Sequence, residues 1–169
     1  MSKKLDPTPD DAPVAAKSAA KPRKAAGAGQ RCLVVGMGAS AGGIEAFGQF
    51  FDAMPADSGA AFVVVLHLDP TRESQMAQVL SAHTTMPVVQ IKDQMPILPN
   101  HVYVIAPDRD LRVAAEVLHL TMPAEKRGHR HPVDVLFRSL AADQGERAIA
   151  IVLSGTGSDG SWLWYSNLP

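Results

Sequence analysis

The sequence predicts an α/β fold: a doubly wound, mostly parallel sheet in a three-layer α/β/α arrangement, with a small antiparallel hairpin. Short apolar, β-branched runs alternate with longer segments in which apolar residues recur at helical spacing. Two of the runs, FVVVL and AIAIVL, are unbroken, which is typical of strands covered on both faces. The length of 169 residues suits one domain.

In the first half of the folded part, strand and helix are predicted to alternate. The apolar run 32–35 ends in glycines and predicts a first strand. Residues 43–53 carry apolar side chains at helical spacing, and Pro55 ends that helix. Residues 62–66 predict a second strand, and residues 73–82 a second helix.

The second half adds short strands, a hairpin and one long helix. Residues 88–91 and 102–105 predict two more strands, and residues 111–120 predict the antiparallel hairpin. Pro132 suits the first turn of a helix that runs to about residue 143. Residues 148–153, the run AIAIVL, predict a last buried strand.

The first thirty residues differ in composition from the rest. They are rich in Ala, Pro and Lys, and hold six basic residues against three aspartates, a net charge of +3. Such a segment buries too little apolar surface to offset its ordering entropy. We therefore expect residues 1–30 to be a disordered basic tail and residues 31–160 to form the domain.

Composition excludes several classes of protein. The formal net charge of −1 argues against a nucleic-acid partner. No run of eighteen apolar residues is present, so we expect no insertion into a membrane, and the N-terminus lacks the apolar core of a secretory signal. One cysteine, Cys32, cannot build an internal disulfide framework or a cysteine zinc site. We expect a cytoplasmic protein.

Polar residues follow three of the predicted buried strands. Ser40 lies five residues after the first strand, His67 directly follows the second, and Asp159 lies six residues after AIAIVL. In a doubly wound sheet, ligands bind beyond the carboxyl ends of the strands. A serine, a histidine and an acid at one such edge are a nucleophile, a general base and an orienting carboxylate.

The residues around Ser40 strengthen this hypothesis. Gly38-Ala39-Ser40-Ala41-Gly42 matches the nucleophile-elbow pattern G-x-S-x-G. The start of the helix that follows favours developing negative charge. The chain order Ser, His, Asp differs from the Ser, Asp, His order of the α/β-hydrolases. A triad is defined by geometry, so this excludes only that superfamily.

The same glycines allow two other interpretations. Residues 36–41 also match G-x-G-x-x-A, a dinucleotide-binding fingerprint, although the acid expected about twenty residues on is Asp69, thirty-three residues after Gly36. Alternatively, the glycines only permit close packing of a helix on the sheet. From the residues alone, hydrolase, nucleotide-binding domain and inert fold all remain open, with the hydrolase favoured.

Four segments in order carry a family resemblance. They are VVGMGASAGGIEAF, FVVVLHLDP, HPVDVLFRSLA and IVLSGTGSDG. In order and spacing they resemble the catalytic domain of the chemotaxis protein-glutamate methylesterases (CheB), over about residues 31–160. Residues 86–107 and 143–160 resemble especially the versions fused to a methyltransferase in CheB/CheR hybrid proteins.

The resemblance implies an activity and its residues. The family hydrolyses glutamate γ-methyl esters on chemoreceptors and deamidates certain receptor glutamines, without metal or cofactor. By motif position Ser40 matches the nucleophile, His67 the base and Asp159 the orienting acid. The backbone N–H groups of His67 and Thr156 match the oxyanion donors. The resemblance implies a methyl-accepting receptor as partner, and a CheR-type methyltransferase as a further one.

Two further expectations concern the substrate groove and the C-terminal part of the domain. Arg72 and Glu73, just past His67, are candidates to border the substrate groove. After Gly160 the family continues with a long helix and a further strand, whereas this chain continues with the aromatic segment 161–169, SWLWYSNLP. We therefore expect an incomplete domain at the C-terminus. A truncated, non-catalytic remnant is the alternative to an active methylesterase.

Overall fold

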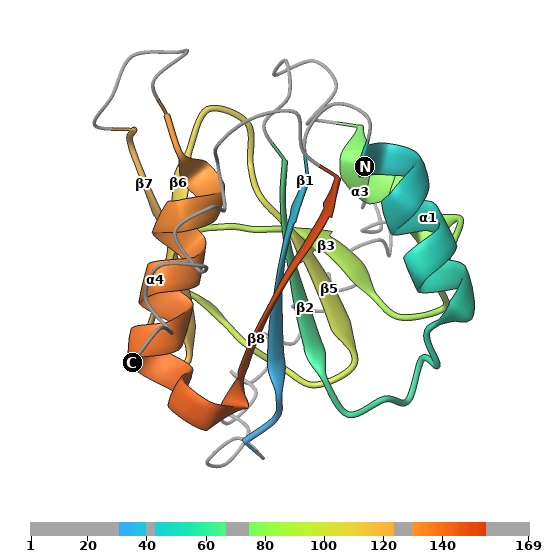
Figure 1. Ribbon diagram of the computed structural model, residues 1–169, viewed down its shortest axis with the longest axis horizontal. Helices are drawn as coiled ribbons and strands as arrows, with labels where there is room; N and C mark the ends of the chain where they lie inside the picture. The colour runs from blue at the N-terminus through green and yellow to red at the C-terminus, as the bar shows by residue number, and fades with distance from the viewer. Residues whose placement is uncertain (1–30, 40–42, 67–74, 124–129, 155–169) are drawn as a thin grey trace, which may run out of the picture.

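The computed structural model describes residues 31–39, 43–66, 75–123 and 130–154 (Figure 1). These residues form two sheets and three α-helices, arranged as an α/β/α sandwich with a small antiparallel sheet beside it. The elements in chain order are β1 (Val34–Ala39), α1 (Gly43–Ala53), β2 (Ala61–Leu66), α3 (Met76–Ser81), β3 (Val88–Gln90), β4 (Met95–Pro96), β5 (His101–Val104), β6 (Asp110–Ala114), β7 (Val117–Thr121), α4 (Pro132–Gln144), a 3-10 turn η1 (Gly145–Arg147) and β8 (Ala148–Ser154).

The main sheet is parallel throughout and has the strand order β3-β5-β2-β1-β8. The chain moves from β1 to β2 on one side, and β8 later joins β1 on the other side. β1 is therefore the strand at which the direction of winding reverses. In open parallel sheets, ligands bind at this switch point, beyond the carboxyl ends of the strands.

Two apolar cores lie on the two faces of this sheet. On one face, α1 and α3 cover alternate residues of β1 and β2, such as Met37 and Val64. On the other face, α4 and the small sheet cover the intervening residues, such as Val34 and Val63. Figure 1 shows α4 on one side of the sheet and α1 with α3 on the other. The predicted three-layer arrangement is confirmed.

The close approach of α4 to β1 depends on two glycines. A Cβ atom at Gly36 would lie 2.8 Å from Cδ2 of Leu140, and one at Gly38 would overlap Cγ1 of Val133 and lie 3.0 Å from its Cγ2. Interiors pack at crystal-like density, so no room remains there for even one methyl group. The interpretation of these glycines as helix-packing positions is therefore confirmed for Gly36 and Gly38.

The first strand is longer than predicted. The expected strand 32–35 lies at Val34–Ala39 in the structure and continues through both glycines. A glycine-rich segment is a weak strand former by itself, so its pattern suggested a turn. Pairing with β2 and β8 on both sides overrides that local preference. Ser40 consequently follows the strand directly and does not lie five residues beyond it.

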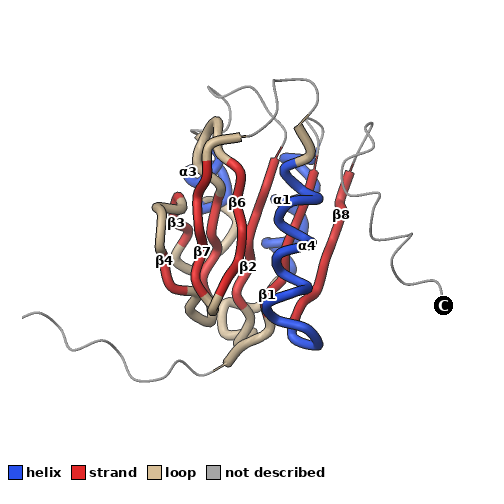
Figure 2. The backbone as a smooth tube through the Cα atoms, turned by 90° about the vertical axis from the view of Figure 1, so that its left-hand side faces the viewer, coloured by secondary structure: helices blue, strands red, loops and turns tan. Residues whose placement is uncertain are grey.

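The last strand is less buried than predicted. AIAIVL does form β8, but β8 lies at the edge of the sheet (Figure 2). Ile149 is 41% exposed and Val152 is 48% exposed, so the expectation of a strand covered on both faces was wrong for the described part of the chain. An unbroken apolar run indicates a covered strand but not what covers it.

The predicted hairpin is confirmed as β6 and β7, which pair antiparallel around Ala115 and Glu116. Both turn residues have positive φ, 53° and 61°, as a tight two-residue hairpin turn requires. The sequence did not predict β4, which adds a third strand to this small sheet. β4 has two residues, one of them Pro96, and so carries no periodic signal.

We predict that Gly38→Ala lowers the free energy of unfolding by about 1–3 kcal/mol, because the new methyl group overlaps a β-branched side chain that has little freedom to move. Val133→Ala removes the obstructing atoms, so the Gly38→Ala/Val133→Ala double variant should lose less than the sum of the two single losses. Chemical denaturation of the four proteins measures this. Strictly additive losses would contradict the packing argument.

Candidate active site

The three strands that precede the candidate catalytic residues lie side by side. β1 lies between β2 and β8, and all three run parallel. At their carboxyl ends Ala39 is opposite Leu66 on one side and Ser154 on the other. Neighbouring strands are about 4.8 Å apart. The chain therefore leaves three adjacent strand ends at one edge of the sheet.

These strand ends lead directly into the sequence-predicted site. Ser40 is the next residue after β1, and His67 the next after β2. Asp159 and Thr156 follow β8 within five residues. Ser40, His67, Thr156 and Asp159 lie outside the described residues, as do the groove candidates Arg72 and Glu73. The triad and groove assignments therefore stay predictions, and the structure defines the frame that carries them.

The frame beneath the candidate site is buried and tightly packed. Ala39 is 5% exposed and Leu66 is 2% exposed, so the last residues of β1 and β2 are fixed in the core. The first turn of α4 presses on β1 through Val133 and Gly38, two residues before Ser40. Sites built on rigid elements hold catalytic geometry better than sites on free loops.

A register shift marks the end of β8. Gly38 pairs with Val152, but Ala39 pairs with Ser154, so Leu153 is an extra residue between them. Such bulges bend a strand locally and are common beside active sites, where they redirect the following side chains. Sequence analysis missed this feature, because no residue type in AIAIVLS indicates it. The bulge lies one residue before the end of β8, the strand that precedes Asp159 in the sequence.

An ion pair ties two elements together near this edge. Nη1 of Arg130 donates to Oδ1 of Asp108 at 2.6 Å. Asp108 follows the carboxyl end of β5, and Arg130 lies two residues before the start of α4. The pair therefore fixes the start of α4 to the β5–β6 connection, on the side of the sheet where β2 also ends.

The described residues show no metal centre, and the thiol of Cys32 is not activated. Within the described part of the chain, no group of three or more His, Cys, Asp and Glu side chains is placed to hold a metal ion. Cys32 precedes β1, at the amino-terminal edge, and burial raises the pKa of its thiol. A thiol with a raised pKa is a poor nucleophile at neutral pH.

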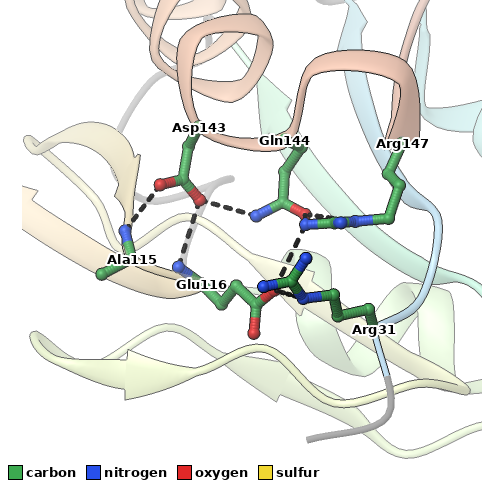
Figure 3. Close-up of polar contacts among 6 residues, drawn as sticks. All are labelled: Arg31, Ala115, Glu116, Asp143, Gln144 and Arg147. Carbon is green, nitrogen blue, oxygen red and sulfur yellow. Dashed lines mark hydrogen bonds and ion pairs between the residues drawn. The ribbon is translucent and has the colours of Figure 1, made fainter.

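A connected polar cluster lies at the opposite edge of the sheet and was not predicted from the sequence (Figure 3). The Asp143 carboxylate, near the end of α4, accepts hydrogen bonds from the backbone N–H groups of Ala115 and Glu116, at 2.6 and 3.1 Å. The Glu116 carboxylate in turn pairs with Arg147 at 3.2 Å and with Arg31 at 3.6 Å. These contacts join the hairpin turn, the end of α4 and the start of β1.

The cluster determines the protonation of Asp143. Partial burial raises the pKa of its carboxyl group. The hydrogen bonds from the Glu116 N–H, the Gln144 side-chain amide and the Ala115 N–H, together with the charge of Arg147, outweigh burial and leave the pKa below its ordinary value. The folded state therefore favours the ionised form of the Asp143 carboxyl group. Its location at the amino-terminal edge makes its role structural.

Among the described helices, the longest, α4, has 13 residues, too few to cross a bilayer. The architecture thus defines a class: a parallel α/β protein whose candidate catalytic loops follow three adjacent strands at the switch point.

Comparison with known proteins identifies the family within this class. A family model described as CheB methylesterase matches residues 35–162. A protein-glutamate methylesterase/protein-glutamine glutaminase of Xanthomonas oryzae is 37% identical over 133 residues, covering 76% of this chain and 37% of that protein. One from Pseudomonas aeruginosa is 34% identical over 151 residues, covering 87% and 43%.

A solved structure agrees. The CheB methylesterase catalytic domain of Thermotoga maritima superposes with a TM-score of 0.67 at 27% identity, covering 77% of this chain and 71% of that one. The chain belongs to the CheB methylesterase family. It spans little more than a third of the length of the Xanthomonas relative.

We predict that Asp143→Ala lowers the free energy of unfolding by about 1–3 kcal/mol at pH 7, because two backbone N–H groups lose a charged acceptor. The pKa of Asp143 is lower in the folded state, so its contribution is complete above the unfolded pKa of about 3.9 and is lost as the pH falls through the folded value. The difference between parent and variant should therefore narrow below about pH 4.

Urea denaturation at a series of pH values measures this difference. Glu146→Ala, a nearby exposed acid, is the matched control and should change stability by less than about 0.5 kcal/mol. A difference between parent and Asp143→Ala that widens in acid would show that the carboxylate does not act as a charged acceptor.

Proposed function

We propose that this chain hydrolyses glutamate γ-methyl esters of methyl-accepting chemotaxis receptors, with Ser40 as nucleophile, His67 as general base and Asp159 as orienting acid. The observation that carries the proposal is the adjacency of β2, β1 and β8 at the switch point, because their ends lead into these three residues. The names of the Xanthomonas and Pseudomonas relatives, protein-glutamate methylesterase, support the same chemistry.

The proposed reaction is an acyl transfer in two halves. His67 takes the proton from the Ser40 hydroxyl as its oxygen attacks the ester carbonyl carbon, and a tetrahedral oxyanion forms. The oxyanion collapses, the bond to the methoxy group breaks, and His67 returns the proton so that methanol leaves. Water then attacks the acyl-serine with His67 again as base, which releases the glutamate carboxylate and restores Ser40.

Each remaining residue has a distinct part in this proposal. Asp159 holds the imidazole of His67 in one tautomer and stabilises its protonated form. The backbone N–H groups of His67 and Thr156 donate to the oxyanion, and one such donor contributes about 3–4 kcal/mol to the transition state. Arg72 and Glu73 border the groove that takes the receptor segment. None of these steps needs a cofactor.

The names of the relatives also include protein-glutamine glutaminase. The same residues would deamidate a receptor glutamine by the same route, with ammonia as the leaving group in place of methanol. In this proposal the chain acts in the cytoplasm on the receptor. A CheR-type methyltransferase forms the methyl ester that this chain hydrolyses.

The nucleotide-binding interpretation is less well supported by the described residues. In a dinucleotide fingerprint, glycines bring the backbone close to a pyrophosphate. Here Gly36 and Gly38 face the side chains of α4, which occupy the space that a Cβ atom would need. Helix packing therefore accounts for both glycines without a nucleotide.

We predict that Ser40→Ala lowers the rate of ester hydrolysis by a factor on the order of 10⁴–10⁶, because no other group takes the place of the nucleophile. The measurement is release of labelled methanol from methylated chemoreceptor membranes. Ser81→Ala, an exposed serine at the end of α3, is the matched control and should keep the parent rate.

Circular dichroism and thermal unfolding of both variants should match the parent. Turnover that persists in Ser40→Ala would refute the nucleophile assignment. Absence of methanol release from the folded parent chain would refute the proposed activity and favour the non-catalytic remnant.

A further inference from the structure

The outer edge of β8 is an apolar surface that no described strand covers. β8 ends the strand order of the main sheet and pairs with β1 on its inner side. Within residues 31–39, 43–66, 75–123 and 130–154, no other strand pairs with it. Its sequence, AIAIVLS, has neither a charge nor a proline. An edge without such protection is a template for another strand.

The exposed side chains of β8 lie on both faces of the sheet. Ile149 is opposite Val35, which belongs to the core under α1, whereas Val152 is opposite Gly38, which faces α4. They are 41% and 48% exposed. A strand that covers both must be apolar at successive positions, because alternate residues point to opposite faces. An amphipathic strand would cover only one of them.

This chain contains a segment of that kind shortly after β8. Ser161 is followed by Trp162, Leu163, Trp164 and Tyr165, four successive large apolar or aromatic residues. Trp162 and Trp164 would share one face of a strand, and Leu163 and Tyr165 the other. Aromatic residues also favour strands. The six residues between, 155–160, include three glycines and are long enough for a hairpin loop.

We propose that residues 161–165 pair antiparallel with the outer edge of β8 and cover Ile149 and Val152. The segment is tethered to β8 through six residues, so its effective concentration at this edge exceeds that of a second copy of the chain. The added strand closes the loop 155–160 at both ends. That loop contains Thr156 and Asp159, so the pairing would also fix the direction of the candidate acid.

The two tryptophans make this proposal directly measurable. Trp162 and Trp164 are the only tryptophans in the sequence, so intrinsic tryptophan fluorescence reports on this segment alone. In the full 169-residue chain we expect emission shifted to the blue of the denatured chain and quenching by acrylamide severalfold weaker. Amide hydrogen exchange should show protection of the alternate N–H groups of β8 that point away from β1.

Variants of the edge test the location. Ile149→Lys/Val152→Lys places two charges where the segment is proposed to bind, and should shift the emission to the red and raise quenching severalfold. Leu98→Lys/Val79→Lys is the matched control, because these side chains are 41% and 38% exposed and lie off β8. It should leave both signals unchanged. Circular dichroism checks that each variant is folded.

Three results would overturn the proposal. Tryptophans of the folded parent chain that are quenched as readily as in denaturant would show that the segment binds nothing. Emission that shifts with protein concentration, together with a dimer in analytical ultracentrifugation, would assign the edge to a second copy. Rapid exchange of all the outward-facing β8 amides in the parent chain would show an open edge, whatever the behaviour of the variants.

Discussion

The close contact between α4 and β1 is the constraint on which the rest of this structure depends. β1 lies between β2 and β8, so the distance at which α4 packs on β1 sets the position of the whole layer. Gly36 and Gly38 permit that distance, and Val133, Phe137 and Leu140 fill the space they leave. The glycine-rich segment before Ser40 is thus a packing surface first, whatever else it does.

This packing has a consequence for chemistry. The first turn of α4 touches β1 two residues before Ser40, and β1 is buried from end to end. The loops at the carboxyl edge therefore leave from a rigid base, the condition under which side chains from separate loops keep a catalytic arrangement. Because the winding reverses at β1, the ends of β2 and β8 lie on either side of the end of β1. Strand pairing alone brings the three ends together.

The opposite edge shows how the protein offsets local strain. Ala115 and Glu116 are not glycines, yet both adopt positive φ, which costs on the order of 1 kcal/mol or more for each. The Asp143 carboxylate accepts hydrogen bonds from both of their backbone N–H groups. This cluster therefore stabilises the hairpin turn and the end of α4 at the edge opposite the candidate site.

The sequence predicted most of the fold because strands and helices of this length have distinct periodicities. The helices at 43–53 and 132–143, the hairpin and the strand FVVVL all lie close to their predicted bounds. The errors have a common cause. The length of β1, the two-residue β4 and the Asp143 cluster are set by pairing and contacts between distant segments, which no local pattern reveals.

For the candidate site, too, local patterns were predicted from the sequence and long-range features were not. Strand ends and their order follow from the alternation of elements, so the sequence was sufficient to place Ser40 and His67 after two of the strands of the sheet, with His67 directly after its strand. It placed Ser40 five residues beyond its strand instead of directly after it, because the predicted strand stopped before the glycines. The bulge at Leu153 could not be predicted from the sequence, because a register shift depends on how the whole of β8 pairs with β1. The register of the last residues of β8 is therefore a tertiary property.

The disagreement at β8 is itself informative. AIAIVL has the composition of a strand buried on both faces, yet Ile149 and Val152 are exposed on opposite faces among the described residues. Natural sequences are locally consistent with the environment they occupy. Apolar side chains on an exposed edge strand are inconsistent with water, and they indicate that another segment covers this edge. The required partner is narrowly defined, since it must be extended and apolar on both faces along the stretch from Ile149 to Val152. β8 also leads into the segment that carries the candidate acid Asp159, so the exposed apolar edge and one of the three candidate catalytic residues depend on the same strand.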